Sequence, residues 1–156
     1  MKLIFKQRFF SWLDSYDIYD EYGNVVYSVE GKLSWGHKLH ILNQYHEHIG
    51  TVKEVVLTFL PRFELYQYDQ CIGTISKEFT FLKPSFRIDF NGWQVKGDFM
   101  GWDYSILDHQ GITIASISKE IFRFTDTYVI DVNNDSDILY ALMVVLAIDA
   151  EKCSNN

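Results

Sequence analysis

The chain has 156 residues, enough for one domain with a hydrophobic core, and no linker or low-complexity stretch divides it. Hydrophobic residues make up 47% of the sequence, which excludes a disordered protein, and aromatic residues make up 17%, which favours β-structure over a helical bundle. The net charge of −7 argues against a nucleic-acid partner and disfavours contact with an anionic membrane surface, although it leaves room for a local basic pocket.

The two cysteines and the N-terminal segment bear on the cellular compartment. Cys71 and Cys153 cannot form a disulfide framework, which is typical of a reducing compartment. The first thirteen residues contain Lys2, Lys6 and Arg8 but no apolar run of signal-peptide length and no small-residue cleavage site. We therefore expect a cytoplasmic protein.

A pattern of two-strand length recurs along the chain. Gly50, Gly73 and Ala115 each begin a segment that continues with a hydroxyl residue, a β-branched residue and a Lys-Glu pair. Tyr27 begins a weaker copy, and Tyr27, Gly50 and Gly73 are spaced by 23 residues. This period is too short for a propeller blade of four strands, which takes roughly 40 residues, but it fits two strands with their turns.

Apolar and polar residues alternate with period two inside these copies, which predicts strands with one buried face. For example, Phe86, Ile88 and Phe90 alternate with Arg87 and Asp89. Turn-forming residues separate the expected strands, at 20–24, 68–73, 91–92 and 108–111. The pattern therefore predicts an antiparallel β-meander from about residue 3 to residue 132.

The last apolar run, residues 138–148 (Ile-Leu-Tyr-Ala-Leu-Met-Val-Val-Leu-Ala-Ile), has no polar face at any helical angle. Residues 135–137 (Asp-Ser-Asp) offer N-cap oxygens before it, and we expect Asp149 and Glu151 to end it. A helix that is apolar all round is surrounded by protein or by lipid. The run has only eleven residues, whereas a bilayer span needs roughly 20, so we expect no transmembrane span.

A curled antiparallel sheet that closes around this helix would leave no free strand edge and would keep the helix dry. We therefore predict a mainly β fold, a closed antiparallel β-barrel that encloses one hydrophobic C-terminal α-helix. The core positions that we expect on the helix are Leu139, Leu142, Val145 and Leu146. We predict a single domain over residues 1–152, followed by a polar tail at 153–156.

Several segments resemble one known family in their order and spacing. They are 95–108 (Val-Lys-Gly-Asp-Phe-Met-Gly-Trp-Asp-Tyr-Ser-Ile-Leu-Asp), 114–120, 126–132 and the apolar helix, with further similarity at 5–11 and 25–33. Together they resemble the LURP-one-related family of the Tubby C-terminal-like group, which also includes the phospholipid scramblases. The resemblance implies a twelve-stranded barrel around a central hydrophobic helix. Tubby proteins bind a phosphoinositide head group through basic side chains, but no motif here carries those residues over one by one.

His46 and His48 are the best candidates for metal ligands. Two imidazoles that are two residues apart on a strand share a face, and zinc sites use such pairs. The repeat instead places both histidines in a loop before Gly50, and the other three histidines supply no clear third ligand. We therefore expect no metal ion and no cofactor.

The sequence contains no constellation typical of an enzyme. No Gly-x-Ser-x-Gly nucleophile elbow occurs. Asp98 and Asp103 could act as paired carboxylates in acid–base catalysis, but Gly97 and Gly101 indicate a bend on which both acids are solvated. We therefore expect a protein that is not an enzyme.

Three lysines that recur with the repeat are the candidate contacts for an anion or a lipid. Lys53, Lys77 and Lys119 would form a small anion pocket if neighbouring strands brought them together. A glutamate directly follows each of them, so local neutralisation is the alternative.

These observations predict a non-catalytic cytoplasmic binding or interaction module of the LURP-one-related type, whose partner is an unknown protein or a small ligand. The alternative is a protein that binds a phosphoinositide or another lipid head group at a membrane surface.

Overall fold

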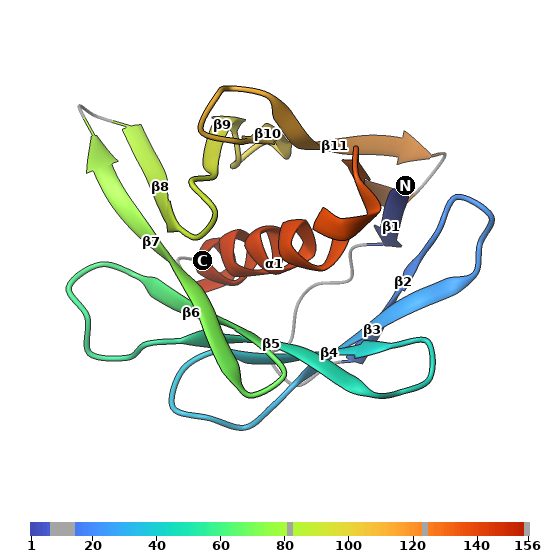
Figure 1. The fold of residues 1–156 in the computed structure, drawn as a ribbon, viewed down its shortest axis with the longest axis horizontal. Helices are drawn as coiled ribbons and strands as arrows, with labels where there is room; N and C mark the ends of the chain where they lie inside the picture. The colour runs from blue at the N-terminus through green and yellow to red at the C-terminus, as the bar shows by residue number, and fades with distance from the viewer. Residues whose placement is uncertain (7–14, 81–82, 123–124, 155–156) are drawn as a thin grey trace.

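Twelve strands form one closed antiparallel barrel in the computed structural model, which describes residues 1–6, 15–80, 83–122 and 125–154 (Figure 1). Each strand pairs with the next one along the chain, and pairing of the first strand with the twelfth closes the barrel. The strands are β1 (Lys2–Lys6), β2 (Ser15–Tyr19), β3 (Val25–Gly31), β4 (Lys38–Asn43), β5 (His48–Glu54), β6 (Arg62–Gln67), β7 (Gln70–Thr80), β8 (Lys83–Asp89), β9 (Gln94–Asp98), β10 (Asp103–Leu107), β11 (Thr113–Phe122) and β12 (Thr125–Val132). The predicted barrel is confirmed, including the strand number that the family resemblance implied.

The period-two alternation of the sequence produces the two faces of the barrel wall. In β8, Phe86 and Ile88 are buried, whereas Arg87 and Asp89 are exposed. A strand places successive side chains on opposite faces, so each alternating segment turns its apolar residues inward.

The small residues of the repeat lie where there is little room for a larger side chain. A Cβ atom at Gly73 would lie 2.6 Å from the carbonyl oxygen of Asp89, and one at Gly50 would lie 2.5 Å from the terminal methyl carbon of Met143 on the enclosed helix. Ala115 is fully buried. Close approach of neighbouring chain segments therefore explains why the repeat needs small residues at these positions.

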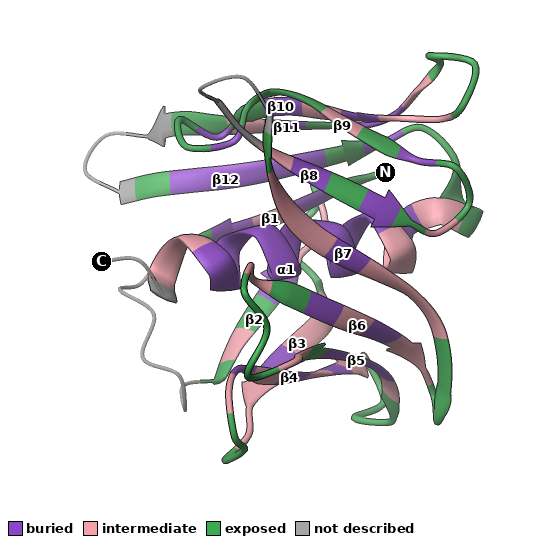
Figure 2. Cartoon of the chain, turned by 90° about the vertical axis from the view of Figure 1, so that its left-hand side faces the viewer, coloured by how far each residue is buried: buried purple, intermediate pink, exposed green. Residues whose placement is uncertain are grey.

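The enclosed helix α1 (Ile138–Ser154) follows a short 3-10 turn, η1 (Asp135–Asp137). Figure 2 shows it inside the barrel, with buried residues along most of its length. Leu142, Val145 and Leu146 are buried, whereas Leu139 is half-buried at the edge of the core. Asn134 is the N-cap of η1 and forms no side-chain cap, and its backbone carbonyl accepts a hydrogen bond from the backbone N–H of Asp137.

The expectation that Asp149 and Glu151 end the helix is wrong. The helix continues to Ser154 and includes Cys153, and the two acids are only 3% and 2% exposed. Glu151 keeps its place because the ammonium group of Lys77 on β7 forms an ion pair with it. An acidic residue therefore ended the apolar run of the sequence without ending the helix.

The barrel has two ends of different construction. Connections that follow even-numbered strands, at 20–24, 44–47, 68–69, 90–93, 108–112 and 133–137, lie at the end where α1 begins, here called the turn end. Connections that follow odd-numbered strands lie at the other end, here called the loop end, and the described ones are 32–37, 55–61 and 99–102. Figure 2 places the loop end and the C-terminus of the chain on the left.

Candidate functional site

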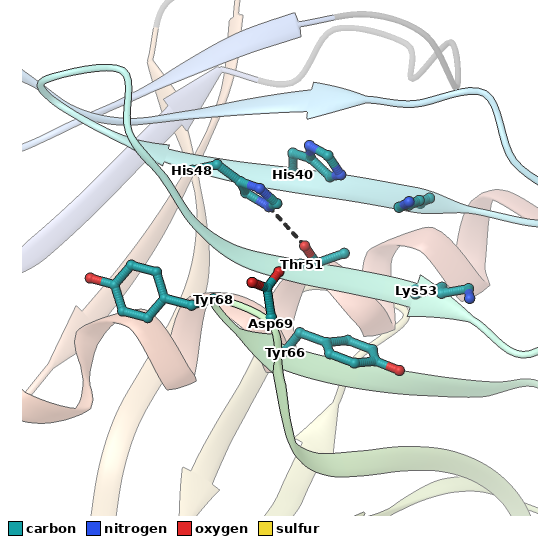
Figure 3. Close-up of a pocket in the computed structure, with 8 residues that line it drawn as sticks. His40, His48, Thr51, Lys53, Tyr66, Tyr68 and Asp69 are labelled. Carbon is teal, nitrogen blue, oxygen red and sulfur yellow. Dashed lines mark hydrogen bonds between the residues drawn. The ribbon is translucent and has the colours of Figure 1, made fainter.

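A pocket of about 350 Å³ lies on the outer face of strands β4, β5 and β6 (Figure 3). Leu39 on β4 faces the core, so its neighbours Lys38 and His40 face outward. The strand register places Lys38 opposite Lys53. The lining residues are Lys38, His40, His48, Thr51, Lys53, Tyr66, Tyr68 and Asp69.

Two stacked histidine rings form one wall of the pocket. The ring centroids of His40 and His48 are 3.9 Å apart, and the ring planes differ by 12°. Burial, followed by the nearby His48, Lys32 and Lys38, lowers the pKa of His40 to about 4. His40 is therefore uncharged at neutral pH, and the two rings stack without a pair of full positive charges.

The orientation of His48 is set by two hydrogen bonds to its own strand. Its Nε2 atom lies 2.9 Å from the carbonyl oxygen of Gly50 and 2.8 Å from the hydroxyl oxygen of Thr51. A carbonyl oxygen only accepts, so Nε2 carries a proton, and Nδ1 is an acceptor in the neutral ring. The prediction that His48 lies in a loop is wrong, because it is the first residue of β5, whereas His46 does lie in the β4–β5 turn.

Lys38 and Lys53 give the pocket a pair of facing cations. Neither lysine forms an ion pair with any residue that the structure describes. Glu64 lies opposite Lys53 on β6, but its carboxylate accepts the hydroxyl hydrogen of Tyr66. That hydrogen bond, with a smaller contribution from burial, raises the pKa of Tyr66 to about 12.

The structure does not bring the three predicted lysines together. Lys53 lines the pocket, whereas Lys77 points to Glu151 on the enclosed helix and Lys119 on β11 forms an ion pair of 2.8 Å with Asp126. Lys38, which the sequence analysis did not single out, is the lysine that accompanies Lys53. Only the register of β4 and β5 places Lys38 opposite Lys53, and the sequence alone does not reveal that register.

Lys77 and Lys119 are neutralised by partners other than the adjacent glutamates, whereas Lys53 forms no ion pair with the described residues. Glu54 lies 2.8 Å from the imidazole of His37, and Glu78 pairs loosely with Arg87 at 3.8 Å. Successive residues of a strand point to opposite faces, so a lysine and the glutamate after it cannot readily meet.

The two candidate acids lie on an exposed bend. Asp98 and Asp103 face each other across the β9–β10 hairpin, both are exposed, and Asp98 accepts a hydrogen bond from the backbone of Gly101. The bend at this position is confirmed. Within the described part of the chain, no cluster of three His, Cys, Asp or Glu residues could hold a metal ion.

A second polar group, which sequence reasoning missed, lies inside the barrel near the loop end. Burial raises the pKa of Asp149 to about 7, although Lys152 lowers it, and one carboxylate oxygen of Asp149 has no hydrogen-bond partner among the described residues. Lys152 donates to the backbone carbonyls of Phe99 and Met100 and lies 4.3 Å from the ring centroid of Trp102. These contacts attach the end of α1 to the β9–β10 turn.

Comparison with known proteins identifies the family. Residues 1–149 match the family model described as LURP-one-related. The chain belongs to the LURP-one-related family. It is also similar to the uncharacterised protein YxjI of Bacillus subtilis, with 25% identity over 150 residues that cover 96% of this chain and 92% of YxjI. No solved structure matches this member of the LURP-one-related family.

The family assignment supplies a fold and no specific activity, and a barrel alone does not transfer one. Among the described residues, no helix is both long enough and apolar enough to cross a membrane. The chemistry of the outer pocket is therefore the main guide to function.

Proposed function

We propose that this protein is a non-catalytic binding module that holds a small anionic group, such as a phosphate ester, in the pocket on the outer face of β4, β5 and β6. The observation that carries the proposal is the facing pair Lys38 and Lys53. Like charges directly opposite each other on neighbouring strands are destabilising, and an anion between them would reverse the sign of that interaction.

The remaining wall of the pocket suits an anion that also carries hydroxyl groups. His40 is neutral at physiological pH and can exchange hydrogen bonds with the hydroxyl groups of a ligand, and the Nδ1 atom of His48 is an acceptor when that ring is neutral. Asp69 supplies a carboxylate acceptor at the turn-end side of the pocket. A phosphorylated polyol presents both kinds of group.

The contact between His48 and Thr51 supports binding over catalysis. A hydroxyl nucleophile needs a base that accepts its proton. The Nε2 atom of His48 lies close enough to the Thr51 hydroxyl, but its proton is already donated to the carbonyl of Gly50. Thr51 is also only 7% exposed, so a substrate could not readily reach its hydroxyl oxygen.

The test is a titration with two soluble probes, inorganic phosphate and inositol 1,4,5-trisphosphate, followed by amide chemical shifts in β4, β5 and β6. We expect saturable shifts with the trisphosphate, and Lys38→Gln or Lys53→Gln should each weaken binding by roughly tenfold, as loss of one charge-assisted contact does. Lys119→Gln is the matched control, because Lys119 lies on β11 outside the pocket. Equal weakening by Lys119→Gln, or no saturation by about 10 mM probe, would refute the proposal.

A further inference from the structure

The loop end of the barrel exposes large apolar side chains on two neighbouring loops. Leu33 and Trp35 in loop 32–37 are 86% and 88% exposed, and Leu57 and Phe59 in loop 55–61 are fully exposed. At the same end, Phe79 near the end of β7 and Met100 in the β9–β10 turn are also exposed. Isolated apolar residues are common on protein surfaces, but a group of this size at one end of a domain indicates an interaction site.

The two loops are held together. The backbone N–H of Glu54 donates to the carbonyl of His37, and the backbone N–H of His37 donates to the Glu54 carboxylate. Gly36 allows the loops to touch, because a Cβ atom there would lie 2.6 Å from a methyl carbon of Val56. The apolar side chains therefore project from a joined pair of loops.

Leu57 is displayed by a strained backbone. Its φ angle is +64°, in the left-handed region that a bulky residue seldom adopts. The hydroxyl of Thr58 donates to the carbonyls of Val55 and Leu60 and closes the turn around it. Strain of this kind persists where surrounding contacts enforce it, often at ligand-binding positions.

Charge is distributed unevenly between the two ends. The six connections of the turn end contain no lysine or arginine, and their acids are Asp20, Glu21, Glu47, Asp69, Asp108, Asp135 and Asp137. On the same basis, the described connections of the loop end contain Lys32 and no acid. The strand residues beside them include the acids Glu54, Asp98 and Asp103 and the cations Lys38, Lys53 and Arg62. None of these three cations forms an ion pair within the described ranges. The net charge of −7 therefore does not describe the loop end.

We infer that the loop end docks on the surface of an anionic lipid bilayer, with Leu33, Trp35, Leu57 and Phe59 entering the interfacial region. This inference rests on the proposed function, because it assigns the anion of the Lys38–Lys53 pocket to a lipid phosphate. A bilayer interface is fluid and can accommodate side chains that project from separate loop tips. Tryptophan is enriched at that interface. The cations beside the loops complement anionic head groups, and the acidic turn end faces away.

The test is co-sedimentation with phosphatidylcholine vesicles that contain no phosphatidylserine or about 30% phosphatidylserine at physiological salt. We expect binding to the anionic vesicles. The combined variant Leu33→Ser, Trp35→Ser, Leu57→Ser and Phe59→Ser should bind at least about a hundredfold more weakly, because four large apolar side chains lose their buried area. The matched control Tyr22→Ser, Tyr45→Ser and Ile112→Ser removes exposed side chains of the turn end and should bind like the original protein.

The outcomes separate this inference from the proposed function. If inositol 1,4,5-trisphosphate binds but the vesicles do not, bilayer docking is wrong and the anion pocket stands. Vesicle binding that survives the loop variant, or that the turn-end control also abolishes, overturns the docking of the loop end. A dimer in sedimentation velocity that the loop variant dissociates would assign the loops to a second copy of the chain and would also overturn it.

Discussion

The chain reverses direction differently at the two ends of the barrel. At the turn end, one side-chain oxygen closes each of three turns by accepting backbone N–H groups two and four residues later. These contacts run from Tyr22 and Asn24 to Asp20, from Tyr45 and Glu47 to Asn43, and from Gln110 and Ile112 to Asp108. At the loop end, loops 32–37 and 55–61 are longer and expose apolar side chains that no local hydrogen bond requires. Side-chain hydrogen bonds therefore account for three chain reversals of the turn end, whereas the exposed apolar side chains of these two loops have no such structural role.

The strongest test contrasts an enclosed leucine with an exposed one. Leu142 on α1 is fully buried and Leu57 at the loop end is fully exposed. Truncating a buried leucine costs about 2–5 kcal/mol, and burying a charge costs more, against a total stability of about 5–15 kcal/mol. Leu142→Asp should therefore be unfolded or insoluble, and Leu57→Asp should melt cooperatively like the original protein, as measured by circular dichroism.

Removal of residues 138–156 extends the same test to the whole helix. A helix that the barrel encloses cannot be removed without exposing the inward faces of the strands. A truncated chain that stays monomeric and melts cooperatively with β-type circular dichroism would show that the barrel does not need the helix.

The next effect concerns the ion pair near the loop end. The side chains of Lys77 and Glu151 are 15% and 3% exposed, whereas those of Lys119 and Asp126 are 36% and 44% exposed. Removing one member of a buried pair costs about 3–5 kcal/mol, and exposed pairs contribute at most about 1 kcal/mol. Lys77→Met should therefore lower the free energy of unfolding by several kcal/mol in urea titrations. Lys119→Met should barely change it, and equal effects would refute the enclosed position of Glu151.

Asp149, near the loop end, should make the free energy of unfolding depend on pH. The pKa of Asp149 is raised to about 7 from its usual 3.8, so the folded protein binds the extra proton. Its contribution to stability is complete below pH 3.8 and is lost as the pH rises through 7. Asp149→Asn should therefore raise the free energy of unfolding at pH 8 by about 2–4 kcal/mol and change it little at pH 4.

His40 acts in the opposite direction and needs its own control. Its pKa is lowered to about 4, so its contribution is complete above its usual 6.5 and is lost as the pH falls toward 4. Comparing Asp149→Asn with the original residue in a His40→Gln background isolates the aspartate. An unchanged difference between pH 4 and pH 8 would show that Asp149 is not desolvated.

Much of the fold was accessible to sequence reasoning because it depends on local patterns. The period-two strands and the apolar run at 138–148 predicted a barrel around a helix, and the turns at 20–24, 91–92 and 108–111 were placed correctly. The turn expected at 68–73 ends at residue 69, because β7 already begins at Gln70. The true end of α1 was missed because the pairing of Lys77 with Glu151 joins residues that are 74 positions apart. Sequence patterns do not report such contacts.

The candidate site was less accessible, because it depends on strand register. The β4–β5 ladder shifts between Ile41 and Leu42, where an irregularity carries His48 beside His40. Alternation predicts which residues face outward but not which of them stand opposite each other. The apolar loops were present in the sequence as Lys-Leu-Ser-Trp-Gly-His and Val-Val-Leu-Thr-Phe-Leu-Pro, but only the topology places them at one end.

The smallest predicted effect tests the turn end. The Asp108 carboxylate accepts the backbone N–H groups of Gln110 and Ile112 at 2.8 and 2.9 Å in an exposed turn. Two exposed hydrogen bonds of this kind contribute about 1 kcal/mol, so Asp108→Ala should lower the free energy of unfolding by that amount in urea titrations. Asp108→Asn keeps an oxygen acceptor and should retain most of the stability.

Neither change should alter sedimentation with anionic vesicles, whereas Leu57→Ser should alter it without changing stability. If Asp108→Ala weakened vesicle binding as much as Leu57→Ser does, the assignment of stability to the turn end and of vesicle binding to the loop end would be wrong.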